Sequence, residues 1–156
     1  AIDKKVYPKQ IAFNSIPFVD CFLENNYTRE EMKMVWETHK ILDENISVNP
    51  TAVRVPVLVG HAESIYIETE KEIDIELAKN CLNEFAGISV IDDVQEVDFP
   101  TSFEHGHGTD DVYVGRIRKG LSKNNSLNLW VVADNVRKGA ALNSIQIAEN
   151  LVGSEM

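Results

Sequence analysis

Apolar residues recur every three or four positions in three stretches of the chain, which is the spacing of one face of a helix. Each stretch begins at a residue whose side-chain oxygen can accept hydrogen bonds from the first turn of a helix. The first of these residues, Thr28, precedes Glu31 in the T-x-x-E pattern of a capping box. The sequence therefore predicts three helices, over residues 28–42, 74–85 and 135–152.

Other stretches are rich in β-branched and aromatic residues, which favour strands. Two of these stretches meet at Gly60-His61, and the polar turn SKNNS joins the last two. The segment 95–110 contains one proline and two glycines and is predicted to be a loop. The six predicted strands cover residues 10–14, 52–59, 62–69, 88–92, 111–119 and 127–134. Strands adjacent in sequence, combined with helices, indicate an α+β domain with a mixed or antiparallel sheet.

Composition narrows the class of protein and of partner. A length of 156 residues and a hydrophobic fraction of 44% are typical of one soluble globular domain. The formal net charge of −10 disfavours a nucleic-acid partner, because phosphates would be repelled. No apolar run reaches the roughly 20 residues of a membrane span, and the N-terminus lacks a signal core, so we expect a cytoplasmic protein with no membrane partner. Cys21 and Cys81 lie at unrelated spacing and are expected to be free, buried or half-buried thiols.

The run TAVRVPVLVGHAE, residues 51–63, holds one arginine and one histidine among apolar residues. A guanidinium cannot lose its proton, so Arg54 needs an anionic partner, either a structural acidic residue or the carboxylate of a substrate. His61 is a candidate acid/base group, although a lone histidine is more often simply hydrogen-bonded. Their odd separation would aim them at opposite faces of an unbroken strand, so a shared site requires an irregularity near Pro56 or Gly60.

Three further features could carry chemistry. Glu30, Lys33 and Glu37 share one helix face, which is typical of solvated ion pairs, and Glu30 with Lys33 is the pair of interest. The HGHG run at 105–108 offers two imidazoles but no third ligand, so no metal is expected. The last helix begins near Asn135 and could receive a phosphate. Glycine-rich nucleotide-binding signatures are absent from the sequence.

Five segments follow one another along the chain: YPKQIAFNSIP, YTREEMKMVWETHKIL, TAVRVPVLVGHAE, DDVYVGRIRK and LNLWVVADNVRKGAALNSIQIAE. Together they resemble the C-terminal half of bacterial aspartate-semialdehyde dehydrogenases, over nearly the whole chain. The resemblance implies that residues 1–156 form a catalytic and dimerisation domain similar to that of glyceraldehyde-3-phosphate dehydrogenase. Such a domain has helices on one face of a mixed, largely antiparallel sheet. The last helix is then expected to pack on an upstream nucleotide-binding domain.

The resemblance also implies a role for each candidate residue. Arg54 matches the arginine that grips the substrate's carboxylate, and His61 matches the general acid/base. Glu30 matches the acid that contacts the substrate's amino group, and Lys33 the lysine that helps to bind phosphate. Asn135 matches a position facing the NADP cofactor. The family reduces aspartyl phosphate to its semialdehyde through a thioacyl enzyme, and a homodimer with a small anionic substrate is expected.

The departures from the family pattern limit what the chain is expected to do alone. The family's nucleophilic cysteine, a substrate-placing glutamine segment and the cofactor domain are expected upstream, and Cys21 and Cys81 do not match the nucleophile. Ala62 replaces the serine of the more common GHSE run. The isolated chain is therefore predicted to be inactive. Two alternatives stay open: a non-catalytic dimerising module of the same fold, and a related N-acetylglutamyl-phosphate reductase.

Overall fold

The computed structural model describes residues 6–153, and the chain divides into two units, Ala1–Pro56 and Val57–Met156. One helix lies in the first unit, whereas the second unit holds a four-stranded sheet and the other helices. Within the described residues, every helix is too short or too polar to cross a membrane.

Helix α1, Arg29–Ile41, begins at the predicted capping box. The Thr28 hydroxyl accepts a hydrogen bond from the backbone N–H of Glu31 at 3.3 Å, and the Glu31 carboxylate accepts one from the backbone N–H of Thr28 at 2.7 Å. These reciprocal bonds satisfy two N–H groups that the first helical turn leaves without intrahelical partners. The helix prediction is confirmed to within one residue at its C-terminal end.

Two predicted strands, residues 10–14 and 52–59, are wrong. Residues 10–14 form a turn, in which the Asn14 N–H donates to the Ile11 carbonyl at 3.0 Å. Residues 52–59 form no strand and bend at 58–59, and among the described residues their one sheet-like pairing is an isolated antiparallel bridge between Ile16 and Arg54. A strand needs a continuous partner for its backbone groups, and alternating side chains do not supply one.

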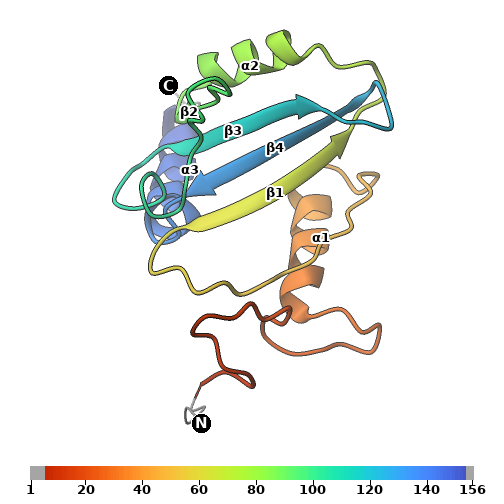
Figure 1. Cartoon of the computed structure of the whole chain (residues 1–156), viewed down its shortest axis with the longest axis vertical. Helices are drawn as coiled ribbons and strands as arrows, with labels where there is room; N and C mark the ends of the chain where they lie inside the picture. Colours follow the sequence, from red (N-terminus) through yellow and green to blue (C-terminus); the bar gives the residue numbers. More distant parts are fainter. Residues whose placement is uncertain (1–5, 154–156) are drawn as a thin grey trace. The chain divides into compact units, whose positions relative to one another are not determined.

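The second unit is built on a sheet with the order β1-β4-β3-β2 (Figure 1). The first two neighbouring pairs are antiparallel, and β2 runs parallel to β3. This arrangement confirms the predicted α+β class with a mixed, largely antiparallel sheet. The strands are β1 (His61–Glu68), β2 (Ile88–Val90), β3 (Val112–Lys119) and β4 (Ser126–Ala133). β2 ends two residues earlier than predicted, and the segment 95–110 forms turns and loop as expected.

One face of this sheet forms the core of the second unit. Its buried side chains come from β3 and β4, namely Val114, Ile117, Leu127 and Leu129. Helix α2, Ile75–Glu84, packs against them with Ala78 and Leu82. The Asp74 carboxylate caps this helix by accepting hydrogen bonds from the first turn, as predicted. Burial of these apolar side chains is the main force that holds α2 on the sheet.

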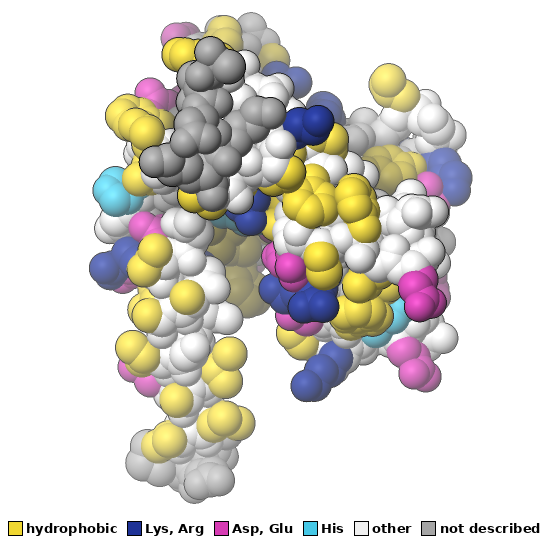
Figure 2. Space-filling view, turned by 90° about the horizontal axis from the view of Figure 1, so that it is seen from below, with side chains coloured by type: hydrophobic (Ala, Val, Ile, Leu, Met, Phe, Trp, Pro, Cys, Tyr) yellow, Lys and Arg dark blue, Asp and Glu magenta, His cyan; other side chains and the backbone are white. Residues whose placement is uncertain are grey.

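The C-terminal helical segment differs from the prediction of one regular helix. It begins with a π-helical turn, η1 (Arg137–Ala141), and continues as α3 (Leu142–Gly153). The expected apolar stripe is present, but its members Ile145 and Val152 are 56% and 62% exposed. Hydrophobic side chains accordingly lie at the surface along this helix (Figure 2). Within its own unit, α3 leaves this apolar face uncovered.

Candidate functional site

The first residue of β1 lies opposite the last residue of β4. In the antiparallel register, His61 pairs with Ala133, and Asp134 and Asn135 follow directly. The sheet therefore brings His61 and Asn135 to the same end of the sheet, although they are far apart in the sequence. Asn135 is exposed, and its side chain makes no hydrogen bond with another residue of the described chain. Within residues 57–153, this end of the sheet is the only place where the second unit brings two of the predicted site residues together.

Glu63 lies on the same face of β1 as His61, because alternate side chains of a strand point to the same side. Nε2 of His61 is 2.9 Å from Oε1 of Glu63, and both side chains are about half exposed. The hydrogen bond from the imidazole, together with its charge, holds the pKa of the Glu63 carboxyl below its usual value. Glu63 is therefore ionised at neutral pH, and its carboxylate is a hydrogen-bond partner that orients the imidazole.

Gly60 turns the chain immediately before His61. Its φ of 78° lies in the left-handed region, and a Cβ at this position would lie 2.6 Å from the Gly106 carbonyl oxygen and 2.7 Å from that of Ser102. Only glycine satisfies both the torsion and the close backbone approach. The irregularity expected near Gly60 is therefore present. Arg54 belongs to the first unit and His61 to the second.

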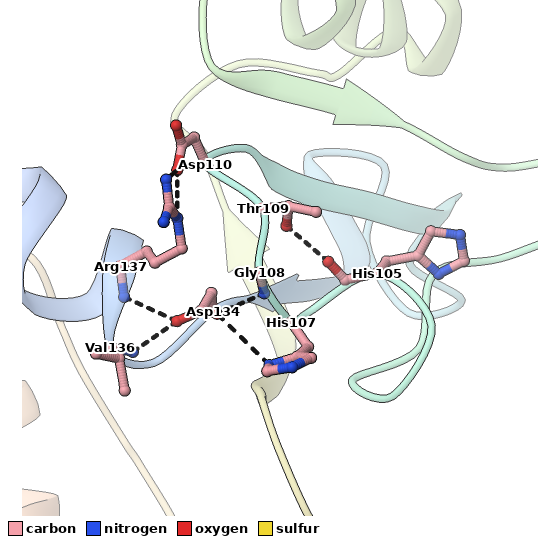
Figure 3. A network of polar contacts seen from close by, with 8 residues as sticks. All are labelled: His105, His107, Gly108, Thr109, Asp110, Asp134, Val136 and Arg137. Carbon is pink, nitrogen blue, oxygen red and sulfur yellow. Dashed lines mark hydrogen bonds and ion pairs between the residues drawn. The ribbon is translucent and has the colours of Figure 1, made fainter.

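The buried carboxylate of Asp134 joins three segments at this end of the sheet (Figure 3). Its Oδ1 accepts hydrogen bonds from the backbone N–H groups of Val136 at 2.8 Å and Arg137 at 2.7 Å. Its Oδ2 accepts one from the N–H of Gly108 at 2.7 Å. The bonds from Arg137, Gly108 and Val136 hold the pKa of Asp134 below its usual value. Asp134 thereby connects the end of β4 to the start of η1 and to the loop at Gly108. These bonds fix the backbone around Asn135.

The two histidines of the HGHG loop have different partners: in Figure 3 the His105 carbonyl accepts a hydrogen bond from Thr109, whereas the His107 ring lies near Asp134. Nδ1 of His105 accepts a hydrogen bond from the Thr101 N–H at 3.2 Å, and its ring packs on Tyr113 with centroids 5.3 Å apart. Nδ1 of His107 lies 3.9 Å from Oδ2 of Asp134. The described part of the chain holds no group of three or more histidine, cysteine or acidic residues that could bind a metal ion.

Arg54 lies in the first unit with its backbone fixed on both sides. Its N–H donates to the Ile16 carbonyl and its carbonyl accepts from the Ile16 N–H, both at 2.9 Å. The guanidinium lies over the ring of Tyr7, 5.2 Å from the centroid, in a cation–π contact. No acidic side chain among the described residues forms an ion pair with Arg54. The guanidinium therefore has no structural carboxylate partner within residues 6–153.

Glu30 and Lys33 form the predicted pair on α1. Nζ of Lys33 is 3.2 Å from Oε2 of Glu30, and both side chains are roughly half exposed. The hydrogen bond that Lys33 donates to Glu30, and the negative charge of that residue, raise the pKa of Lys33 above its usual value. The pair thus presents a carboxylate and a fully charged ammonium at the surface of the helix.

The family sequence model described as "Semialdehyde dehydrogenase, dimerisation domain" matches residues 1–138. This chain belongs to that family. The matched residues include all four strands and every predicted site residue.

Three proteins similar to this dimerisation-domain chain in sequence or structure are aspartate-semialdehyde dehydrogenases. An aspartate-semialdehyde dehydrogenase of Shewanella violacea is 58% identical over 96% of the chain and 44% of its own length. The structure of aspartate semialdehyde dehydrogenase II from Vibrio cholerae complexed with ASA covers 99% of the chain and 45% of its own, with 51% identity and a TM-score of 0.92. A Candida albicans aspartate semialdehyde dehydrogenase with NADP is 26% identical over 90% of the chain and 45% of its own, with a TM-score of 0.72. The chain thus spans less than half the length of each.

Sequence reasoning missed two residues of the site in this semialdehyde dehydrogenase domain. Glu63 could have been found from its spacing of two from His61 in a predicted strand. Asp134 directly precedes the predicted start of the last helix, but its bond to Gly108 depends on how the loop folds back and has no signal in the sequence.

Proposed function

We propose that this chain is the catalytic and dimerisation part of an NADP-dependent aspartate-semialdehyde dehydrogenase, in the biosynthesis of lysine, threonine and methionine. The reaction reduces aspartyl phosphate to its semialdehyde through a thioacyl enzyme and releases inorganic phosphate. The 58% identity to the Shewanella violacea enzyme over 96% of the chain carries this proposal. Because the chain spans 44% of that enzyme, the nucleophilic cysteine and the cofactor domain are assigned to the rest of the protein.

Arg54 is proposed to bind the carboxylate of the substrate. A guanidinium presents two parallel N–H donors that match a carboxylate, and no described acidic side chain occupies them with an ion pair. The bonds to Ile16 fix the backbone, and the Tyr7 ring covers one face of the guanidinium. The side chain thereby loses less conformational freedom when an anion binds.

Glu30 and Lys33 are proposed to bind the two other charged groups of the reactants. The Glu30 carboxylate would accept hydrogen bonds from the substrate's ammonium group. Lys33, whose ammonium stays charged at neutral pH, would contact the phosphate. Their mutual ion pair at 3.2 Å holds both side chains at the helix surface before the reactants bind. Because the pair is exposed, breaking it when the reactants bind costs little free energy.

His61 is proposed as the general acid/base. It would take the proton of the attacking thiol and later deliver a proton to the departing group, while the ionised Glu63 stabilises the protonated imidazole. The half-buried Cys21 and the exposed Cys81 are not assigned as the nucleophile.

Asn135 is proposed to face the nicotinamide ring of NADP. Its amide offers both a donor and an acceptor, is exposed at the same end of the sheet as His61 and is not engaged by the described residues. When bound, NADPH supplies the hydride. The contribution of this chain is orientation, since Asp134 fixes the backbone on both sides of the amide.

The exposed apolar face of α3 is proposed to pack on the nucleotide-binding half of the same protein. Ile145, Leu151 and Val152 are each more than half exposed, and a contiguous exposed apolar face marks a surface for interaction. The relatives carry more than half of their length outside the matched region, which is enough for that partner domain. The parent protein is proposed to be cytoplasmic.

A homodimer is proposed to form through the sheet face opposite α2. This face carries Tyr66, which is 50% exposed, and Trp130 and Arg118 on neighbouring strands. Aromatic residues and arginine are the residues enriched in protein interfaces. A Tyr66→Asp variant of the intact protein is expected to sediment as a monomer; an unchanged dimer would reject this surface.

The substrate assignment is tested by kinetics of the intact protein that contains this chain. Aspartate semialdehyde and N-acetylglutamate semialdehyde are compared as substrates with NADP and phosphate. We expect turnover of the first and negligible turnover of the second. The opposite preference would favour the reductase alternative, and a purified, folded protein that turns over neither would favour the non-catalytic module.

A further inference from the structure

Glu31 is a buried carboxylate at the start of α1, and 8% of the residue is exposed. Both of its oxygens are engaged: Oε2 accepts a hydrogen bond from the Thr28 N–H at 2.7 Å, and Oε1 accepts one from the Ala52 N–H at 2.9 Å. The first bond belongs to the capping box. The second reaches a segment 21 residues further along the chain and has no part in capping the helix.

These two bonds join the segments that hold the proposed substrate-binding residues. Glu30 and Lys33 lie on the first turns of α1, on either side of Glu31 in the sequence. Arg54 lies two residues beyond Ala52, where mutual backbone bonds to Ile16 fix it as well. Glu31 is thus the direct connection between the helix and the extended segment.

We infer that Glu31 is a positioning residue, which sets the separation between the Arg54 guanidinium and the Glu30–Lys33 pair. The inference rests on the proposed function of those three residues. A substrate with a carboxylate, an ammonium group and an acyl phosphate has to meet all three side chains at once. A change in their separation weakens every one of these contacts together.

The chemistry of Glu31 matches this role. The backbone bonds from Thr28 and Ala52 hold the pKa of Glu31 below its usual value, so that the carboxylate keeps two acceptor oxygens at neutral pH. An amide in its place has one acceptor oxygen, and its NH2 group would face one of the two N–H donors. Glu31→Gln therefore breaks one of the two bonds while it preserves the size of the side chain.

The test uses the intact protein, with kcat, the KM for aspartate semialdehyde and the KM for phosphate measured in three variants. Glu31→Gln breaks the connection. Thr28→Ala removes the hydroxyl that caps the Glu31 N–H but leaves both carboxylate bonds. Glu44→Gln removes a charge at an exposed position of the same unit and serves as the control. Thermal melting follows the folding of each variant.

We expect Glu31→Gln to raise both KM values by about 10-fold or more while kcat changes by about 2-fold or less. Thr28→Ala is expected to lower the melting temperature with KM values like those of the wild type, and Glu44→Gln to change neither. If Glu31→Gln and Thr28→Ala both lower the melting temperature and both keep wild-type KM values, Glu31 is only a helix cap.

A second variant covers the case in which Glu31→Gln does not fold. Glu31→Asp keeps the charge but shortens the side chain by one methylene, so it is expected to raise both KM values in the same direction. Wild-type KM values for a folded Glu31→Asp would overturn the inference. Failure of the proposed function is a separate result: the wild-type protein would then not turn over aspartate semialdehyde at all.

Discussion

His61 and Glu63 face the same side of β1, with Nε2 of the imidazole 2.9 Å from Oε1 of the carboxylate. In the intact protein, His61→Asn is expected to lower kcat roughly 100-fold or more, because general acid/base catalysis contributes about that factor. Glu63→Gln keeps the shape but removes the charge that favours the protonated imidazole, so a smaller loss of kcat is expected. Steady-state kinetics measures both.

The double variant separates a shared role from two independent ones. If Glu63 acts through His61, adding Glu63→Gln to His61→Asn is expected to cost little more than His61→Asn alone. Near-normal kcat in His61→Asn would return the histidine to a structural role.

Arg54→Lys is expected to raise the KM for aspartate semialdehyde by about 10-fold or more, because an ammonium cannot replace two parallel guanidinium donors. Arg29→Lys is the matched control, since Arg29 forms an exposed pair with Asp20 at 3.7 Å in the same unit. That variant should keep the wild-type KM. An unchanged KM in Arg54→Lys would remove Arg54 from the substrate site.

Gly60→Ala is expected to destabilise the chain more than Gly87→Ala. Both glycines have positive φ, 78° and 84°, but a Cβ meets the Gly106 and Ser102 carbonyl oxygens only at Gly60 and meets nothing within 4 Å at Gly87. Gly87→Ala should cost about 1 kcal/mol of unfolding free energy from backbone strain alone. Gly60→Ala should cost at least about 1 kcal/mol more, because backbone atoms must move. Urea unfolding of both variants measures the difference, and equal losses would contradict the close approach at Gly60.

Asp134 is expected to make the stability of the chain depend on acid pH. Hydrogen bonds from Arg137 and Gly108, the largest contributors, hold the folded pKa below the usual value of 3.8. Its stabilising contribution is therefore complete above that value and is lost as the pH falls through the lower folded pKa. Unfolding free energy, measured by urea titration between about pH 6 and pH 2, should fall less steeply with pH in Asp134→Asn than in the wild type.

Asp134→Asn also separates the hydrogen bonds accepted by the two oxygens of the Asp134 carboxylate. An asparagine can still accept from Val136 and Arg137 through its one oxygen, whereas its NH2 group faces the Gly108 N–H. At neutral pH, Asp134→Asn should be less stable than the wild type. Asp134→Ala, which loses the bonds of both carboxylate oxygens, should be less stable still. Equal stability of the two variants would mean that the bonds from Val136 and Arg137 contribute nothing.

Elements with a local signal were predictable from the sequence. The capping box at Thr28, the Asp74 cap and the alternation in β1, β3 and β4 each depend on residues close together in the chain. Residues 52–59 are richer in β-branched residues than β1, with four valines against two isoleucines, yet they stay outside the sheet. The difference lies in the partner: β1 pairs along its whole length with β4, while 52–59 finds a single bridge at Arg54.

The candidate site was predictable as a set of residue types but not as an arrangement. The family resemblance pointed to Arg54 and His61, and periodicity placed Glu30 and Lys33 on one helix face. The contact of Glu31 with Ala52 could not be predicted, because it depends on how the chain after α1 returns to the start of that helix. The register that brings Asn135 to the same end of the sheet as His61 likewise appears only when β1 pairs with β4.

The most direct test of the proposed function is the phosphate-dependent reduction of NADP by aspartate semialdehyde. It is measured with the intact protein and with the 156-residue chain alone, at equal concentrations. We expect the intact protein to turn over in a reaction that requires phosphate. We expect no turnover by the chain alone, whose Cys21 and Cys81 are not assigned as the nucleophile. Activity of the chain alone, or none in the folded intact protein, would contradict the proposed function.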